Sequence, residues 1–271
     1  MHTSYCYNFE ISYENKMLFD YYEILVLSFI QGISEFLPIS SSAHLYIISE
    51  LFDFKSQSLM IDVGMHLGSL LAVLIYFKHD FLNIHKNKKI LYLMVIGSIP
   101  LILVGFVIYT TGFINFIRNL ELLAWLSLIF AIVLYFADKI KVTKKIDTDL
   151  NLKSIFIIGL FQIASLFPGV SRSGIVITAG RFLNFDRYDA TKISFYLSVP
   201  AIAGASFLSL KSMFDNDINF NSLVLLSVFL SFIFSYIAIK YFLIFVRNFN
   251  FNIFIIYRII LSLFIFYIIY S

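Results

Sequence analysis

The stretch QGISEFLPISSSAHL, residues 31 to 45, interrupts a strongly apolar part of the chain with a glutamate, a proline, three consecutive serines and a histidine. Short apolar segments precede it (21–30) and follow it (46–52). Proline cannot continue the interior of a helix, because it lacks the amide hydrogen and its ring clashes with the preceding turn. Each flanking segment is also shorter than the ~20 residues that a helix needs to cross the hydrocarbon core. The pattern predicts a re-entrant hairpin, in which a helix enters the membrane, turns at a polar tip and returns.

A second interruption of the same kind follows about 130 residues later. An apolar segment (154–167) leads into PGVSRSG (168–174), and a short apolar segment (175–183) follows. In each case a glutamine and a serine precede a proline and a serine-rich tip: Gln31, Ser34, Pro38 and Ser40 to Ser42 in the first, and Gln162, Ser165, Pro168, Ser171 and Ser173 in the second. We interpret the two as a duplicated unit; the alternative is that membrane hairpins favour proline and serine independently.

The rest of the chain consists largely of apolar runs of membrane-spanning length. Of the 271 residues, 60% are hydrophobic and 14% are charged, and the mean hydropathy is +0.87. A soluble domain averages about 45–50% apolar and about 25% charged residues. Six runs have spanning length: 59–77, 90–109, 120–137, 191–210, 222–246 and 251–270. We therefore predict an all-α polytopic membrane protein, in which each half is a re-entrant helical hairpin plus three transmembrane helices.

The distribution of charge predicts how the two halves are oriented. Three spans are an odd number and a hairpin returns to its own side, so the second half must be inverted relative to the first. One predicted side carries thirteen Lys and Arg residues, and the side with both termini carries four, which are Lys16, Lys55, Arg118 and Lys211. The positive-inside rule makes the more basic side cytoplasmic. Both termini then lie outside, and the two hairpins enter from opposite sides, so that their tips meet near the midplane.

The segments that we predict are a polar N-terminal extension (1–20), a first membrane repeat (21–137), a basic cytoplasmic linker (138–153) and a second, inverted repeat (154–271). The extension lacks the basic-then-apolar order of a signal peptide and is expected to be an unstructured tail, with Met17 as a second candidate start. Cys6 is the single cysteine, so an intramolecular disulfide is excluded. No basic stripe with interleaved aromatic residues indicates a nucleic-acid partner.

Arg172 lies at the second tip, between Ser171 and Ser173. A charged side chain at the bilayer centre costs at least ~2.5–3.5 kcal/mol, so it requires a partner. A guanidinium fits phosphate or carboxylate, and the N–H groups of a short helix that begins near Gly169 would point the same way. We therefore predict an anion site; a structural ion pair between Arg172 and Glu35 is the alternative, and the two are compatible.

The first tip carries the groups that a phosphate-cleaving site needs beside an anion clamp. Glu35 could hold a divalent metal or act as a base, and His44 could carry a proton near neutral pH. Ser40, Ser41 and Ser42 offer hydroxyls as ligands or as a nucleophile. Taken singly, the serines could cap helices and His44 could make a buried hydrogen bond. Together, and opposite Ser-Arg-Ser, they favour catalysis.

Other polar side chains within the predicted spans are interpreted as structural. Asp62 and His66 lie four residues apart on one helix face, where we favour a tie between helices over a supporting role beside the tips. Arg258 is expected to bind a carbonyl or carboxylate of a neighbouring helix. Lys240 is near enough to the end of its span for the ammonium group to reach the interface.

The two interruptions resemble the motifs of the undecaprenyl-diphosphate phosphatases, also called bacitracin-resistance proteins. QGISEFLPISSSAHL (31–45) and FPGVSRSG (167–174) carry the resemblance, which covers nearly everything from Met17 onward. DVGMHLGSLLAVLIYF (62–77), SFYLSVPAIAGA (194–205) and YRII (257–260) add weaker support. The resemblance implies a fold with paired re-entrant helices. It also implies an inner-membrane hydrolase that converts undecaprenyl diphosphate to undecaprenyl phosphate, recycling the carrier for peptidoglycan synthesis, with an active site that opens outward.

The resemblance places the family's motifs on Gln31 and Glu35, on Ser41 and His44, and on Ser171, Arg172 and Ser173, and it implies a requirement for Mg²⁺ or Ca²⁺. With the reasoning from the tips, the predicted catalytic residues are Glu35, Ser41, His44 and Arg172, the substrate-binding residues are Ser40, Ser171, Ser173 and Gly169, and the metal ligands are Glu35 and Gln31. Two positions depart from the family's pattern. Gln31 replaces an acid, and Val176 replaces a threonine, with Thr178 two residues further on.

The expected mechanism is an in-line displacement at the terminal phosphoryl group. Arg172 with Ser171 and Ser173 would neutralise its charge, while Ser41 or a water attacks and His44 moves the proton. A secondary transporter or lipid flippase with a midplane anion site is the main alternative. A second lipid-phosphatase superfamily, with Ser-Arg, five residues and then His, fits poorly, because Thr178 occupies the histidine position. The choice of metal, the lipid chain length and the oligomeric state stay open.

Overall fold

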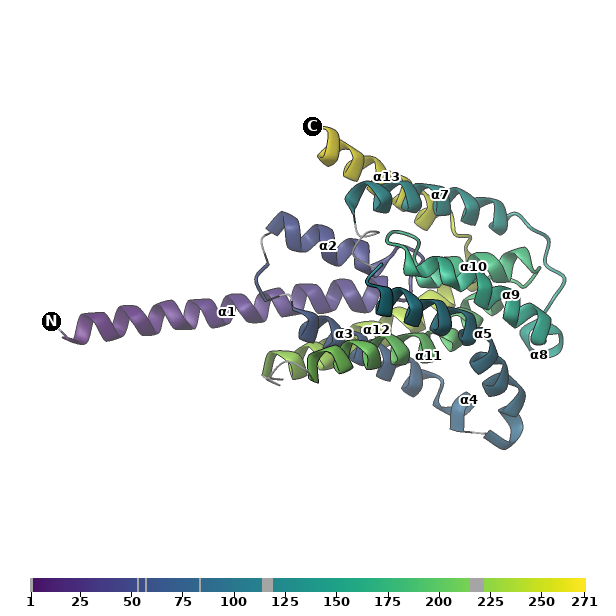
Figure 1. Cartoon of the computed structure of the whole chain (residues 1–271), viewed down its shortest axis with the longest axis horizontal. Coiled ribbons are helices and arrows are strands. Elements are labelled where there is room, and N and C mark those ends of the chain that lie inside the picture. The colour runs from purple at the N-terminus through teal and green to yellow at the C-terminus, as the bar shows by residue number, and fades with distance from the viewer. Residues whose placement is uncertain (1, 53, 57, 83, 114–118, 215–221) are drawn as a thin grey trace.

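The computed structural model describes residues 2–52, 54–56, 58–82, 84–113, 119–214 and 222–271, and these are almost entirely helical (Figure 1). Lys144 and Phe185 form an isolated β-bridge, and the described residues contain no strand. The helices in chain order are α1 (His2–Ser34), α2 (Ser41–Phe52), α3 (Leu59–Tyr76), α4 (Lys78–Leu82), α5 (Ile84–Thr111), α7 (Leu120–Asp138), α8 (Ile146–Asp149), α9 (Leu152–Gln162), the 3₁₀ helix η1 (Ile163–Leu166), α10 (Arg172–Phe182), α11 (Arg187–Phe214), α12 (Ser222–Asn248) and α13 (Asn252–Tyr270).

Six of these helices are long and apolar enough to cross a membrane. Their spanning parts are 59–76, 88–111, 120–138, 187–211, 222–248 and 252–270, each within four residues of the predicted ends. They turn large apolar side chains outward, such as Leu103, Phe207, Leu225 and Leu263, where a lipid surface would receive them. The prediction of an all-α polytopic membrane protein is confirmed. Arg118, one of the four cations counted on the less basic side, lies outside the described residues.

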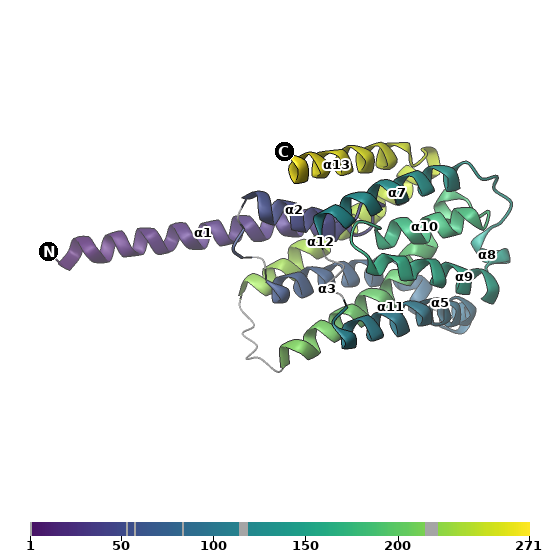
Figure 2. The same cartoon turned by 45° about the horizontal axis from the view of Figure 1, so that its top comes forward.

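Two pairs of helices, each joined by a turn, lie at the predicted interruptions. The first consists of the end of α1, a turn over residues 35–40, and α2. The second consists of α9 with η1, a turn over residues 167–171, and α10. Within each pair the two helices pack against one another, and in Figure 2 both pairs lie among the spanning helices. Both predicted helix breaks are therefore present.

The N-terminal extension differs from its prediction. Rather than an unstructured tail, it is the first part of α1, a helix of 33 residues that is about 50 Å long. Figures 1 and 2 show it reaching beyond the rest of the bundle. The stretch has no proline or glycine before Gly32, so a helix formed further along the chain can extend into it at little cost. No break in the helix marks the boundary predicted at residue 20.

Small residues allow the helices to approach closely where α3 packs on α12. A Cβ atom added to Gly64 would lie 2.5 Å from Ser227 Oγ, so a larger residue would force that side chain to move. Along the same seam Ser69 Oγ lies 3.1 Å from Ser231 Oγ and accepts a hydrogen bond from Ser235 at 3.0 Å. Small and hydroxyl-bearing residues of this kind are the usual means by which helices associate in lipid. This seam places α3, with His66, beside α1.

Candidate active site

The residue before the returning helix has an unusual backbone conformation in both hairpins. Ser40 precedes α2 with φ +73°, and Ser171 precedes α10 with φ +69°. A side-chain-bearing residue in this region costs of order 1–3 kcal/mol and persists only where the surrounding structure enforces it. Ser171 also caps α10, because its Oγ accepts a hydrogen bond from the Gly174 amide at 3.1 Å. The two tips thus share a backbone geometry as well as a composition.

Glu35 lies at the centre of a cluster that joins the two tips. Its Oε1 accepts a hydrogen bond from Arg172 Nη2 at 2.8 Å, which also makes the ion pair. Its Oε2 accepts from Ser41 Oγ at 2.7 Å and from the Gln31 side-chain amide at 3.0 Å. The Glu35 side chain is only 8% exposed, so these three donors replace the water that a carboxylate would otherwise bind.

Further contacts fix the second tip against its surroundings. Ser173 Oγ donates to the Leu37 carbonyl of the first tip at 2.7 Å, and Arg172 Nη1 donates to the Ser194 carbonyl of α11 at 3.2 Å. Ser171 Oγ lies 3.1 Å from Ser173 Oγ. Arg172 is therefore held at both terminal nitrogens, and it makes the ion pair with Glu35 that the sequence analysis gave as compatible with an anion site.

His66 of α3 lies beside this cluster. Its Nδ1 accepts a hydrogen bond from the Gln31 amide at 3.0 Å and is 3.9 Å from Glu35 Oε2, and the side chain is 37% exposed. As predicted, His66 connects two helices, α3 and α1, but it does so beside Glu35 at the predicted site. Asp62, one turn earlier, is in the first turn of α3, where a carboxylate complements the helix dipole.

His44 makes its contacts away from Ser41. Its Nδ1 lies 2.6 Å from the Ser40 carbonyl, which can only accept, so Nδ1 carries the proton. Its Nε2 lies 2.5 Å from the hydroxyl of Tyr257 on α13, and the two rings stack with centroids 5.6 Å apart. A neutral imidazole protonated at Nδ1 accepts at Nε2, so Tyr257 is the donor. The Ser41 hydroxyl instead donates to Glu35.

Tyr257 is a residue that reasoning from the sequence did not assign to the site. The feature of the sequence that could have indicated Tyr257 is its position in YRII, directly before Arg258 in an apolar span. Arg258 itself is buried and donates from Nη2 to the carbonyls of Gly169 and Val170 at 2.8 and 3.2 Å. The predicted carbonyl tie of Arg258 is confirmed, and it supports the second tip.

The remaining predicted residues near the second tip have structural contacts. Gly169 has φ +85°, and a Cβ there would overlap the Leu123 carbonyl of α7, so the turn requires glycine. Thr178 Oγ1 donates to the Gly174 carbonyl of its own helix at 2.7 Å. Val176 belongs to the hydrophobic core. Neither position 176 nor position 178 brings a hydroxyl to Glu35.

The fit of a divalent metal can be judged from the donors present. In the part of the chain that the structure describes, no group of three or more His, Cys, Asp and Glu side chains is placed to hold a metal. Glu35 and the Ser41 hydroxyl offer oxygens, and Gln31 Oε1 is buried without a hydrogen-bond partner. Mg²⁺ is commonly held by one or two carboxylates plus substrate phosphates. These donors therefore fit a divalent metal that would take its remaining ligands from a bound diphosphate.

The fold and the cluster define a class of protein, a polytopic helical membrane protein whose two broken-helix tips enclose a carboxylate, a guanidinium and hydroxyls. The family model described as bacitracin resistance protein BacA matches residues 24–264. The chain is 55% identical to the undecaprenyl-diphosphatase of Pelagibacter ubique, over 92% of this chain and 98% of that protein. It is 41% identical to the undecaprenyl-diphosphatase of Elusimicrobium minutum, over 88% and 94% respectively. It is 37% identical to undecaprenyl-diphosphatase 4 of Bacillus thuringiensis, over 86% and 91%. The chain belongs to the BacA family of bacitracin-resistance proteins.

Proposed function

We propose that this protein hydrolyses undecaprenyl diphosphate to undecaprenyl phosphate and inorganic phosphate, which returns the lipid carrier to cell-wall synthesis. Relatives that match nearly the whole chain have the name of that activity. The observation that carries the proposal is the contact of Glu35 with both Ser41 and Arg172 between the two broken helices. A carboxylate, a hydroxyl and a guanidinium in mutual contact are the groups that phosphoryl transfer requires.

In this proposal Arg172 binds the terminal phosphoryl group of the substrate. Its guanidinium is at the start of α10, where the N-terminal amides and the helix dipole also favour an anion. The bound phosphate takes over donors that Arg172 now gives to Glu35 and to the Ser194 carbonyl. Ser173 keeps its tie to the Leu37 carbonyl, so the two tips stay together while Glu35 is freed for proton transfer.

Glu35 is the group in direct contact with a candidate nucleophile. Ser41 Oγ, or a water that binds the same carboxylate, attacks the terminal phosphorus as Glu35 takes the proton. The bond to the bridging oxygen breaks, and undecaprenyl phosphate leaves with that oxygen. If Ser41 attacks, water then hydrolyses the phosphoserine. This assignment replaces the expected transfer to His44, whose two nitrogens contact the Ser40 carbonyl and Tyr257.

A divalent cation, Mg²⁺ or Ca²⁺, belongs to the same proposal. Glu35 and the unpaired Gln31 Oε1 would hold it together with the substrate phosphates. When bound, the ion would neutralise charge on the phosphate oxygens. Chelation is therefore expected to abolish phosphate release, and either ion should restore it.

We also propose the inverted arrangement, with repeats at 21–137 and 154–271 joined by the linker 138–153, both termini outside and the site open to that side. The helix contacts support it. If the hairpins correspond, α1 matches α9 and α5 matches α12, and α1 packs on α12 as α9 packs on α5. The corresponding helices α3 and α11 also pack on one another, as do α7 and α13, as expected near an axis that relates two halves.

The direct test uses purified protein in detergent, without a membrane gradient. Wild-type protein is expected to release inorganic phosphate from undecaprenyl diphosphate and from a shorter prenyl diphosphate in the presence of Mg²⁺ or Ca²⁺. A transporter or flippase would bind the lipid and release no phosphate under these conditions. Binding without release would therefore favour the alternative over the phosphatase.

A further inference from the structure

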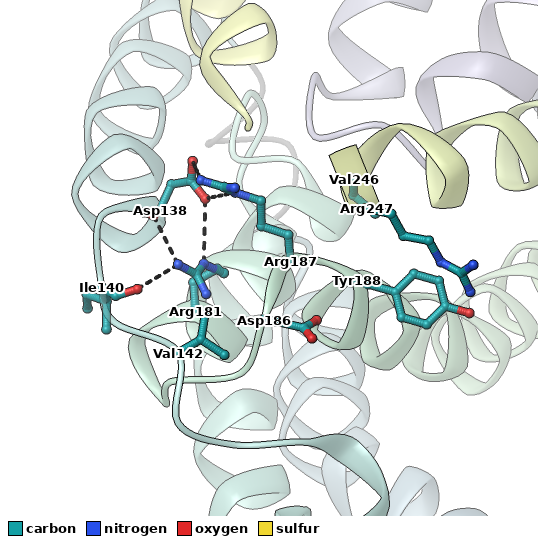
Figure 3. A pocket seen from close by; sticks show the side chains of 9 residues that line it. All are labelled: Asp138, Ile140, Val142, Arg181, Asp186, Arg187, Tyr188, Val246 and Arg247. Atoms are coloured by element: carbon teal, nitrogen blue, oxygen red, sulfur yellow. Dashed lines mark hydrogen bonds and ion pairs between the residues drawn. The ribbon is translucent and has the colours of Figure 1, made fainter. Parts of the chain in front are cut away.

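A second polar site lies away from the two tips, at the end of the bundle where α7, α10 and α12 end and α11 begins (Figure 3). It is a pocket of about 420 Å³. Its walls carry three arginines and two aspartates, which are Arg181, Arg187, Arg247, Asp138 and Asp186. Arg181 follows Arg172 by nine residues on α10, about 13 Å along the helix axis, so this pocket is separate from the proposed active site.

The two carboxylates of the pocket are already engaged. Asp138 accepts from Arg187 Nε at 2.7 Å and from Arg187 Nη2 at 3.1 Å, and the Phe251 amide lies 3.4 Å from it. Asp186 Oδ1 accepts from the Asp189 amide at 2.7 Å, in the first turn of α11. Asp138 is therefore neutralised by an arginine, whereas Asp186 accepts only a backbone amide and keeps its negative charge at the pocket.

One of the three arginines is also engaged, and it has a structural task. Arg181 is buried and donates to the carbonyls of Phe185, Asp138 and Ile140 at 2.5, 3.0 and 2.7 Å. It therefore pins the start of the basic linker to the end of α10. Figure 3 shows its contacts with Asp138 and Ile140.

The other two arginines keep donors for a ligand. Arg187 is 36% exposed and uses Nε and Nη2 for Asp138, which leaves Nη1. Arg247 is exposed, and its guanidinium lies over the ring of Tyr188 at 4.2 Å (Figure 3). Among the described residues neither Arg187 Nη1 nor any nitrogen of Arg247 has a hydrogen-bond partner. The Tyr188 ring limits the motion of Arg247 while its in-plane N–H groups stay available.

We propose that this pocket binds a phosphate group, supplied by the headgroup of an anionic lipid. Guanidinium groups that flank a cavity can donate two parallel hydrogen bonds to the oxygens of a phosphate. The pocket also has one more positive than negative side chain. Two large exposed side chains close to Arg247 in the chain, Ile244 and Phe249, give a lipid chain an apolar surface beside the headgroup. Free inorganic phosphate shares the headgroup chemistry but gains nothing from that surface.

The test is native mass spectrometry of the purified full-length chain with phosphatidylglycerol, phosphatidylcholine or inorganic phosphate as the probe. Arg247→Gln is expected to retain about tenfold less phosphatidylglycerol than wild type, because a charge-assisted hydrogen bond is lost. Arg247→Lys keeps the positive charge but loses the paired N–H donors of the guanidinium, so its retention of phosphatidylglycerol should lie between those of wild type and Arg247→Gln. Lys240→Gln is the matched control, since Lys240 is an exposed cation of the same helix outside the pocket, and it should bind like wild type.

Several results would overturn the proposal. The first is an equal loss of bound phosphatidylglycerol in Arg247→Gln and Lys240→Gln. The second is retention of phosphatidylcholine as strong as that of phosphatidylglycerol. The third is that wild type retains no phosphatidylglycerol. Binding of inorganic phosphate without the lipid would overturn the lipid source. Lipid retention is measured without turnover, and Arg247→Gln is expected to keep phosphatase activity in detergent. Failure here is therefore distinguishable from failure of the proposed function.

Discussion

Glu35 is the residue on which the proposed chemistry depends most directly. Glu35→Gln removes the proton acceptor of Ser41, so phosphate release is expected to fall by about 10²–10⁴-fold, the usual contribution of general acid–base catalysis. The change also leaves Arg172 without its carboxylate partner, which costs about 3–5 kcal/mol for a buried pair. The assay therefore needs a control for lost stability.

Glu23→Gln provides that control. Glu23 is a buried carboxylate of the same helix, 12 residues before Glu35 and so about 18 Å away along the helix axis, and it accepts hydrogen bonds from the Ser56 and Lys55 amides at 2.6 and 3.3 Å. It should lower the thermal midpoint while leaving the activity per folded molecule unchanged. If Glu35→Gln did no more than Glu23→Gln in this comparison, Glu35 would not be the proton acceptor.

The hydroxyl of Tyr257 gives a second test at a single residue. Tyr257→Phe keeps the ring that stacks on His44 and removes the donor to Nε2. A neutral hydrogen bond is worth about 0.5–1.5 kcal/mol net, so the thermal midpoint should fall by a few degrees, while phosphate release, which depends on Glu35 and not on His44, should stay near the wild-type rate. Tyr267→Phe, an exposed tyrosine of the same helix, should change neither quantity.

At this scale the sequence predicted part of the cluster. Glu35 and Arg172 could be named because a charged group at a helix break within the membrane requires a partner, whereas Ser41 was chosen among Ser40 to Ser42 only through the resemblance to the family. The pairing of Ser41 with Glu35 rather than His44 could not be named, since it depends on how α2 is rotated about its axis. His66 and Tyr257 reach the tips only through the packing of α3 and α13, which no local pattern encodes.

At the scale of the element, the strained residue of each tip makes a prediction about stability. Ser40 has φ +73° and contacts Ser42 Oγ only at 3.5 Å, so its side chain contributes little. Ser40→Val should destabilise the protein by about 1–3 kcal/mol, because a β-branched residue resists this conformation. Ser40→Gly should be tolerated. The measurement is the thermal midpoint in detergent, and equal effects of Val and Gly would contradict the argument.

The seam between α3 and α12 makes a second prediction at this scale. A Cβ at Gly68 would lie 2.9 Å from the Phe232 amide nitrogen, so Gly68→Ala should force the helices apart and cost about 1–3 kcal/mol. Gly204→Ala in α11 is the matched substitution, because nothing lies within 4 Å of a Cβ there. It should be neutral or raise the thermal midpoint, since alanine favours a helix. A loss as large as that of Gly68→Ala would rule out crowding as the cause.

The helix breaks illustrate what a local pattern can and cannot predict. All four prolines follow apolar residues, yet Pro100 and Pro200 lie inside continuous helices, whereas Pro38 and Pro168 coincide with turns. The difference is the serine-rich segment after Pro38 and Pro168, whose hydroxyls accept and donate where the backbone leaves the helix. The N-terminal extension was predicted wrongly because polarity was taken as a sign of disorder, although nothing in that stretch ends a helix.

For the whole molecule, the inverted arrangement predicts which positions are accessible from each side. In a Cys6→Ser background, a membrane-impermeant maleimide should label Ser271→Cys in intact cells with a permeabilised outer envelope. It should label Lys141→Cys, in the basic linker, only after the inner membrane is broken. The charge asymmetry is the physical reason, because the linker and its neighbours carry most of the Lys and Arg residues. Labelling of Lys141→Cys in intact cells would contradict the arrangement.

The account rests on the claim that the guanidinium of the second tip and the carboxylate of the first act together on one diphosphate. The most direct measurement is phosphate release from a prenyl diphosphate by purified Arg172→Ala, with Arg247→Gln as a variant that also loses one arginine. We predict that Arg172→Ala is slower than wild type by at least about 10²-fold, as when one preorganised donor to a developing charge is removed, and that Arg247→Gln is unchanged. Folded Arg172→Ala that released phosphate at the wild-type rate would contradict the claim.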